Sequence, residues 1–209
     1  MIIKVSELQK LLTAIEKQNI SITELIERIG NGKEIFEPKW IEKDSIIRFS
    51  VTSDGTTGEE WAEGRLKSKG FWANDYAEST LKSRDFRPTN GIIYKVAVLK
   101  GEIFSNDNNR ITKNIRKKAK SLEFFTPNPE VACLIREKFS DKELKAMGLY
   151  WIAVMHEPIE GFDGTPGLFI VGRGGIGSWL RTRFDSPNSK WERGGGFAFV
   201  ISQVSVFKP

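Results

Sequence analysis

"GLFIVGRGGIGSWLRTRF", residues 167–184, joins an apolar run to a Gly-x-Gly-x-x-Gly pattern that ends at Gly177. This is the spacing of a dinucleotide-binding loop, which holds phosphates at the N-terminus of a following helix. Here the helix would run only from 178 to 184 before Pro187 breaks it. The acidic residue expected about 20 positions further on is also missing. The pattern therefore does not indicate a nucleotide site.

The same segment fits a β-strand. Because side chains alternate along a strand, Trp179, Arg181 and Arg183 would share one side, and the apolar Leu180 would lie on the other. The glycines before them would then form a tight turn between two strands. "GGFAFVISQV", residues 195–204, predicts a final strand near the end of the chain.

The rest of the chain predicts an α+β protein. Hydrophobic periodicity and capping signals indicate a helical hairpin in 1–32, followed by a linker in 33–45 and one ligand-binding domain in 46–209. Within this domain we expect strands at 46–51, 90–104 and 149–159. We expect helices at 59–70, 71–83, 111–122, 128–139 and 140–148.

Composition narrows the class of protein. The chain has 209 residues, a net charge of +5 and a single cysteine, Cys133, so no intrachain disulfide can form. It contains no apolar run of the roughly 18 residues that a membrane span needs, and no signal-peptide pattern. These features predict a cytoplasmic protein with no membrane partner.

The C-terminal order of motifs resembles a known family. "RGGIGSW" (173–179) is followed by arginines, by Trp191 and by a closing "GGFAFV" (195–200). This resembles the end of the C-type lectin fold in formylglycine-generating-enzyme-like domains, and more closely the variable proteins of diversity-generating retroelements. The sequence departs from the pattern by inserting two residues before Ser178, and by having Ala198 where an arginine would fall. The resemblance covers about the last 45 residues and implies a C-type-lectin-like end at 149–209.

The resemblance implies a non-catalytic ligand-binding protein. In that family a rigid lectin-like scaffold displays side chains whose codons a reverse transcriptase diversifies at adenines. The residues that would form the ligand-binding surface are Arg173, Gly174, Ile176, Ser178, Trp179, Arg181, Arg183, Asp185, Asn188, Lys190, Glu192 and Arg193. The expected ligand is a protein or another macromolecule, and homo-oligomerisation stays open.

Many residue types in this segment are ones that adenine-directed codon changes can produce. Randomising the two adenines of an AAC codon can yield Arg, Gly, Ile, Ser, Asp or Asn, and the residues between 173 and 194 are mostly Arg, Gly, Ser, Asn and Asp. They never yield Trp, so Trp179 and Trp191 are expected to belong to the fixed framework. Lys190 and Glu192 need other codons.

Two alternative functions remain open. The basic helix at 110–120 carries Arg110, Arg116 and four lysines, a pattern that suits nucleic-acid phosphates as well as a solvated helix face. His156, the only histidine, would be the general base if the protein were an enzyme, although a hydrogen-bonded structural role is the commoner one.

The sequence predicts no metal or cofactor. One histidine and one cysteine are too few for a zinc site. Glu160 and Asp163 in "EGFDGTPG" (160–167) could face a calcium ion, but a Gly/Pro turn is the simpler interpretation. Cys133 lies in an apolar helix, where we expect it to be a small core residue.

Overall fold

The computed structural model describes residues 38–174 and 178–206. The expected helical hairpin, residues 33–37 of the expected linker, and Ile176 lie outside these ranges. The chain divides into two units, residues 1–41 and 42–209, and the second contains the sheet and helices described below.

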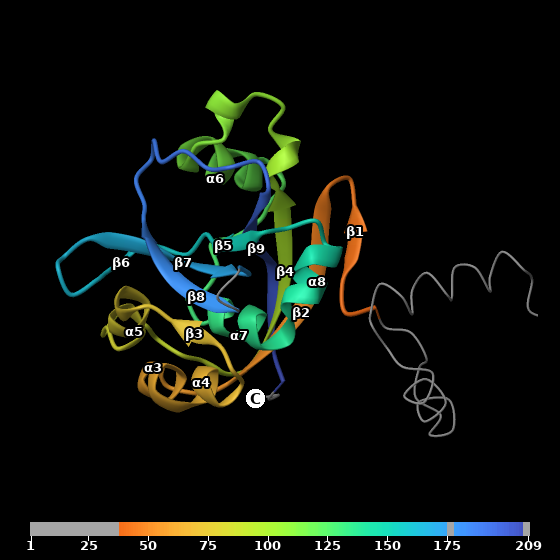
Figure 1. Cartoon of the computed structure of the whole chain (residues 1–209). Helices are drawn as coiled ribbons and strands as arrows, with labels where there is room; N and C mark the ends of the chain where they lie inside the picture. Colours follow the sequence, from red (N-terminus) through yellow and green to blue (C-terminus); the bar gives the residue numbers. More distant parts are fainter. Residues whose placement is uncertain (1–37, 175–177, 207–209) are drawn as a thin grey trace, which may run out of the picture. The chain divides into compact units, whose positions relative to one another are not determined.

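The described residues form a large mixed sheet with helices against it, so the α+β expectation is confirmed at this level (Figure 1). Its strands are β1 (Ile41–Lys43), β2 (Ile46–Asp54), β3 (Trp72–Ala73), β4 (Asn90–Lys100), β5 (Trp151–Val154), β6 (Ile159–Glu160), β7 (Pro166–Gly172), β8 (Trp179–Phe184) and β9 (Gly195–Ser205). The order across the sheet is β1-β2-β4-β9-β5-β7-β8-β3, with β6 paired to β7. β1 falls inside the stretch expected to be a linker.

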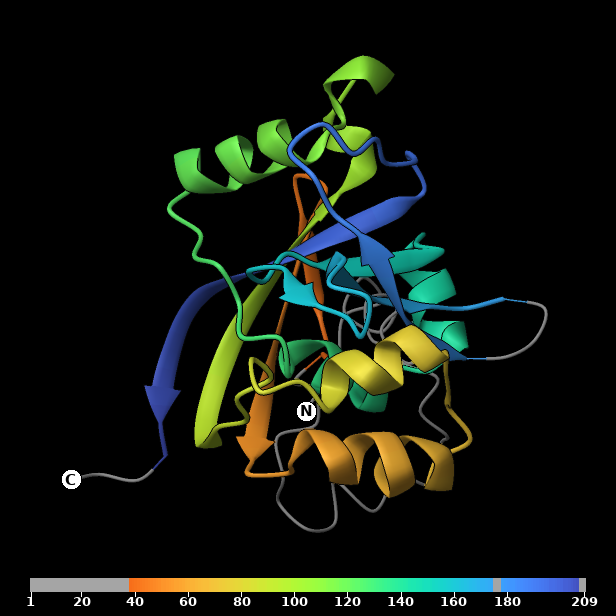
Figure 2. The same cartoon turned by 90° about the vertical axis from the view of Figure 1, so that its left-hand side faces the viewer.

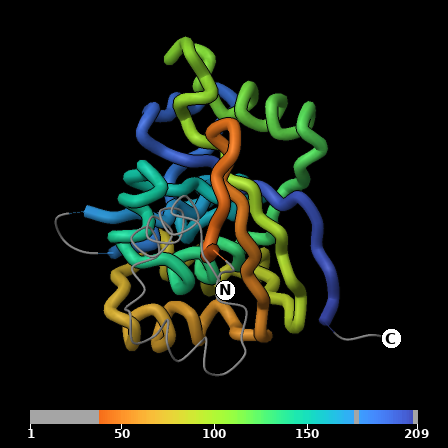
Figure 3. The backbone as a smooth tube through the Cα atoms, turned by 90° about the vertical axis from the view of Figure 1, so that its right-hand side faces the viewer, coloured from red at the N-terminus to blue at the C-terminus, as the bar shows by residue number. Residues whose placement is uncertain are grey.

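The last strand lies in the middle of the sheet. β9 is antiparallel to β4 and parallel to β5, and Figure 3 shows β2, β4 and β9 side by side. Residues 195–200 of β9 are all buried, as a strand covered on both faces must be. The final strand predicted at 195–204 is therefore confirmed, and it joins the two halves of the sheet.

The helices lie on both faces of the sheet (Figure 2). They are α3 (Gly58–Glu60), α4 (Leu66–Ser68), α5 (Asp75–Leu81), α6 (Thr112–Ser121), α7 (Val131–Lys138) and α8 (Asp141–Ala146). A π-helical turn, Trp61–Arg65, joins α3 to α4, so the helix predicted at 59–70 is present as one run with changing geometry. Short 3₁₀ turns follow β4 at Gly101–Ile103 and Asp107–Asn109.

Local capping signals place several of these helices. Ser140 accepts from the backbone N–H of Glu143, whose carboxylate accepts from Ser140 in return, as the capping-box spacing predicts. α5 begins only at Asp75, capped by Asn74, because Trp72 and Ala73 pair with β8 instead of starting a helix at 71. That two-residue strand has no counterpart among the sequence-based expectations.

The two faces of the sheet pack against different helices. One face packs against α7, as the contact between Phe49 and Phe139 shows, with ring centroids 4.7 Å apart. On the other face, Ile115 and Ala119 of α6 pack into a cluster that contains Leu168 and Phe197. None of the described helices is long and apolar enough to cross a membrane.

Candidate functional site: an arginine–tryptophan face

β8 presents a mixed row of side chains on the α6 side of the sheet. Trp179 and Arg181 are half-buried and Arg183 is exposed, whereas Leu180 between them is fully buried on the opposite side. The predicted strand and its alternation are confirmed. Because β7 and β8 form an antiparallel hairpin, no helix follows the glycines, and a dinucleotide loop is excluded.

Arg181 lies against two tryptophans. Its guanidinium carbon is 4.5 Å from the ring centroid of Trp179 and 5.2 Å from that of Trp72. Trp72 reaches this position because β3 pairs with β8, which sets Trp72 beside Trp179. Among the described residues Arg181 has no ion pair, so its guanidinium is positioned by ring contacts and not by an acidic partner.

Arg183 repeats this arrangement further along β8. Its guanidinium carbon is 4.7 Å from the ring centroid of Trp191, and one N–H donates to the carbonyl of Lys190 at 3.2 Å. Trp191 is buried and donates its indole N–H to the hydroxyl of Thr112 at 2.9 Å. Trp191 is thus anchored in the core, and its ring holds Arg183 in place. We call Trp72, Trp179, Arg181, Arg183 and Trp191 the arginine–tryptophan face.

Glycines allow the tryptophan rings to lie against the sheet. Trp179 is the cross-strand partner of Gly172, and a Cβ on Gly172 would lie closer than 3.0 Å to its ring, a separation real Cβ atoms do not show. Gly195 stands in the same relation to Trp151. The absence of a Cβ at these glycines is therefore what lets each ring pack over the neighbouring strand.

The structure separates the predicted surface residues into groups. Exposed side chains or backbone are found at Gly174, Asn188, Lys190, Glu192 and Arg193, in addition to Arg183. Arg173 lies 4.5 Å from a different ring, that of Tyr150, and donates to the carbonyl of Leu149 at 2.8 Å. Ser178 donates to Asp141 at 2.8 Å, which ties the start of β8 to α8.

Asp185 does not belong to the exposed surface. Its side chain is buried and accepts a hydrogen bond from Thr112 at 2.7 Å. Burial raises the pKa of Asp185, and Arg116 lies 3.9 Å away. The prediction of a displayed aspartate fails because the turn after β8 bends this side chain under α6, a contact between residues far apart in the sequence.

The basic helix is less basic on its surface than its sequence indicates. Arg110 is buried and donates to the carbonyls of Gly101, Phe104 and Trp191. Arg116 donates to the carbonyls of Met155 and His156. The exposed charges that remain are Lys113, Lys117, Lys118 and Lys120.

His156 has the structural role that the sequence favoured. Its side chain is fully buried, and Nε2 accepts from the N–H of Phe169 at 3.0 Å while Nδ1 lies 2.6 Å from the carbonyl of Glu157. Burial lowers the pKa of His156 to about 4, so the ring is neutral near pH 7. With both nitrogens engaged, it offers no free base to a substrate.

The remaining candidates are structural as well. Asp163 accepts hydrogen bonds from the N–H of Thr165 at 3.0 Å and from the hydroxyl of Tyr76 at 3.1 Å. These bonds hold a turn around Gly164, whose φ is positive. Cys133 is fully buried, as expected of a core residue. Within 38–174 and 178–206 no group of three or more His, Cys, Asp or Glu side chains could hold a metal ion.

Trp72 is the member of the site that sequence reasoning missed. "FWAND" at 71–75 falls within a stretch that the sequence predicts to be helical. A signal was present, since Asn74 is a strong N-cap and implies that the helix starts after it. Nothing local, however, indicates pairing with β8 more than 100 residues away.

No family model, no curated protein and no solved structure was found to match this chain.

Proposed function

We propose that this protein is a non-catalytic binding protein that holds a protein ligand on the arginine–tryptophan face. The observation that carries the proposal is Arg181, set against two tryptophans with no acidic partner among the described residues. Arginine and tryptophan are the side chains most enriched at binding hot spots, where they supply contact area and directed hydrogen bonds together. Trp72, 44% exposed, enlarges the apolar area that a ligand would cover.

The charge around the face favours an acidic ligand surface. Arg181, Arg183, Lys190 and Arg193 are positive, and Glu192 is the exposed negative residue among the proposed surface positions, since Asp185 is buried. Arginine binds carboxylates through two parallel hydrogen bonds, and contact with a ring leaves the edge of its guanidinium free to do so.

A C-type-lectin-like display scaffold belongs to the same proposal. Three features support it: the β7–β8 hairpin, the closing strand β9 at the centre of the sheet, and tryptophans packed over glycines. Such a scaffold tolerates changes at exposed positions, which usually shift stability by less than about 0.5 kcal/mol. The neighbouring DNA tests the retroelement origin: a reverse transcriptase gene and a near-copy of codons 170–195 differing at adenines are expected. Finding neither would contradict that origin while leaving the binding face untouched.

The binding test compares three single variants of the full chain. Tagged wild type, Arg181→Ala, Trp72→Ala and Lys118→Gln are used to capture proteins from the source cells, followed by quantitative mass spectrometry. We expect one captured protein whose amount falls about tenfold or more with Arg181→Ala and with Trp72→Ala, as it does when a hot-spot residue is truncated. Lys118→Gln should capture the same amount of this protein as wild type. A captured set that is the same for all four proteins would refute the proposal.

A second candidate function is binding of nucleic acid by α6. The four exposed lysines of this helix have no acidic partner among the described residues and could each neutralise a phosphate. A fluorescent single-stranded DNA, titrated at rising salt, distinguishes the two functions. Affinity that falls steeply with salt, weakens in Lys117→Gln/Lys118→Gln and persists in Arg181→Ala would favour this alternative.

A further inference from the structure

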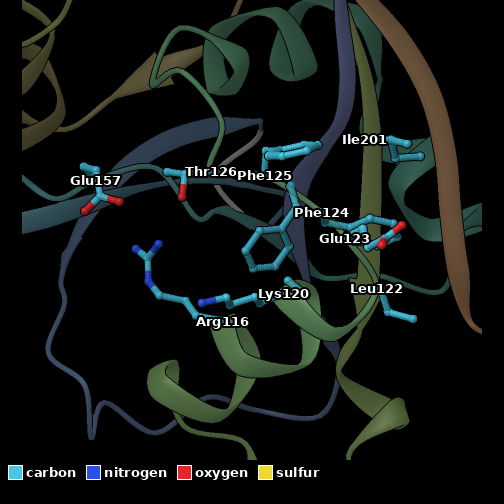
Figure 4. Close-up of a pocket in the computed structure, with 11 residues that line it drawn as sticks. Arg116, Lys120, Leu122, Glu123, Phe124, Phe125, Thr126, Glu157 and Ile201 are labelled. Atoms are coloured by element: carbon cyan, nitrogen blue, oxygen red, sulfur yellow. The ribbon is translucent and has the colours of Figure 1, made fainter.

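A separate pocket of about 860 Å³ opens between α6, the segment that follows it, and β9 (Figure 4). Its size is that of a small-molecule site. The apolar part is made by Leu122, Phe124 and Phe125 beside α6 and by Phe199 and Ile201 of β9. None of these residues belongs to the arginine–tryptophan face.

The wall of the pocket is built by a strained turn. Glu123, directly after α6, has a φ of +59°, a left-handed conformation that normally favours glycine. The N–H of Phe124 bonds back to the carbonyl of Ala119 at 3.0 Å, and Phe125 exchanges two backbone hydrogen bonds with Val200 of β9. The turn therefore fixes the course of the chain where Phe124 and Phe125 line the pocket.

Two cationic side chains enter the same space. The guanidinium of Arg116 donates to the carbonyls of Met155 and His156 at 2.9 and 2.8 Å and lies 3.9 Å from the carboxylate of Asp185. Its remaining N–H groups make no hydrogen bond to the described residues. Lys120, one turn further along α6, has no hydrogen bond or ion pair to any described residue. Figure 4 shows both pointing into the cavity, on the same side as the ring of Phe124.

Two carboxylates limit how much negative charge the pocket can accept. Glu157 and Glu123 also line it, so its four charged side chains sum to zero. A ligand with one anionic group can sit at Arg116 and Lys120 with its apolar part on the phenylalanines. A ligand with several negative charges would meet the glutamates.

We propose that this pocket binds a small organic anion with a single negative charge and an apolar or aromatic body. Arg116 and Lys120 hold the anionic group, and Phe124 and Phe199 contact the body. Such a site would act independently of the arginine–tryptophan face.

A pair of fluorescent probes tests both parts of the proposal. 8-Anilinonaphthalene-1-sulfonate carries one negative charge, and N-phenyl-1-naphthylamine is its uncharged counterpart. We expect the folded full chain to bind the sulfonate at least about fivefold more tightly than the neutral probe, and decanoate to displace it. Equal affinity for the two probes, or no saturable binding, would overturn the proposal.

Variants locate the bound probe. Lys120→Gln is expected to weaken sulfonate binding about fivefold with little effect on the neutral probe, and Phe124→Ala to weaken both by about tenfold or more. Lys118→Gln, on the same helix but outside the pocket, is the matched control and should change neither. Thermal unfolding of each variant without probe establishes that it is folded. Equal weakening by Lys118→Gln and Lys120→Gln would contradict the assignment.

Discussion

Replacing Gly172 by alanine isolates the contact on which the arginine–tryptophan face is built. The new Cβ would lie closer than 3.0 Å to ring atoms of Trp179, so the indole has to move away from the sheet. Gly172 does not have a positive φ, so alanine meets no backbone strain there. Any loss of stability must therefore come from the ring.

Two opposing contributions set the size of the change in stability that Gly172→Ala causes. Replacing a glycine in a strand by alanine stabilises the folded protein by about 0.5–1 kcal/mol, because the unfolded chain loses conformational freedom. Overpacking against a ring costs about 1–3 kcal/mol. Trp179 is only half-buried and can shift towards solvent, which keeps this cost near the middle of the range. We expect Gly172→Ala to lower the free energy of unfolding by about 1–2 kcal/mol.

A double-mutant cycle measured by urea unfolding tests the cause. In a Trp179→Ala background the obstructing ring is gone, so Gly172→Ala should become neutral or stabilise by up to about 1 kcal/mol. Gly64→Ala is the control, since a Cβ at Gly64 meets nothing within 4 Å and helical alanine should stabilise by up to about 1 kcal/mol. If Gly172→Ala costs the same with and without the tryptophan, the proposed role of the glycine is wrong.

Three further stability predictions follow from buried or strained groups. Burial lowers the pKa of His156 from 6.5 to about 4, so the unfolded chain binds the proton more readily. The free energy of unfolding should therefore fall by up to about 3 kcal/mol from pH 7 to pH 4. If a His156→Gln variant loses the same amount of stability over this pH range, the histidine is not responsible. Glu123→Gly should raise the free energy of unfolding by about 0.5–1 kcal/mol, because glycine adopts the φ of +59° found at Glu123 without strain. Ser121→Gly, within α6, is the control and should lower the free energy of unfolding. Equal effects of the two changes in urea unfolding would show that Glu123 is not strained. Arg136 is fully buried and donates to the carbonyls of Gly172 and Phe139, so Arg136→Ala should cost about 3–5 kcal/mol, and a loss under 1 kcal/mol in thermal unfolding would refute this.

Local patterns in the amino-acid sequence are enough to locate the elements around the site. Alternation in 179–184 indicates a strand, and the short run before Pro187 argues against the nucleotide interpretation, which the β7–β8 hairpin excludes. The spacing of Ser140 and Glu143 places the start of α8, and the apolar run at 195–204 places β9. These signals can be read from the sequence because backbone periodicity and caps depend on residues a few positions apart.

Which charged side chains are free depends instead on contacts between distant segments. Arg110 and Asp185 look like surface residues in the sequence, but carbonyls and a hydroxyl from other parts of the chain hold them inside. Trp72 joins the face through pairing with β8, which no local pattern indicates. A buried charge is stable only where its partners converge on it, and that convergence is a property of the folded chain rather than of any one segment.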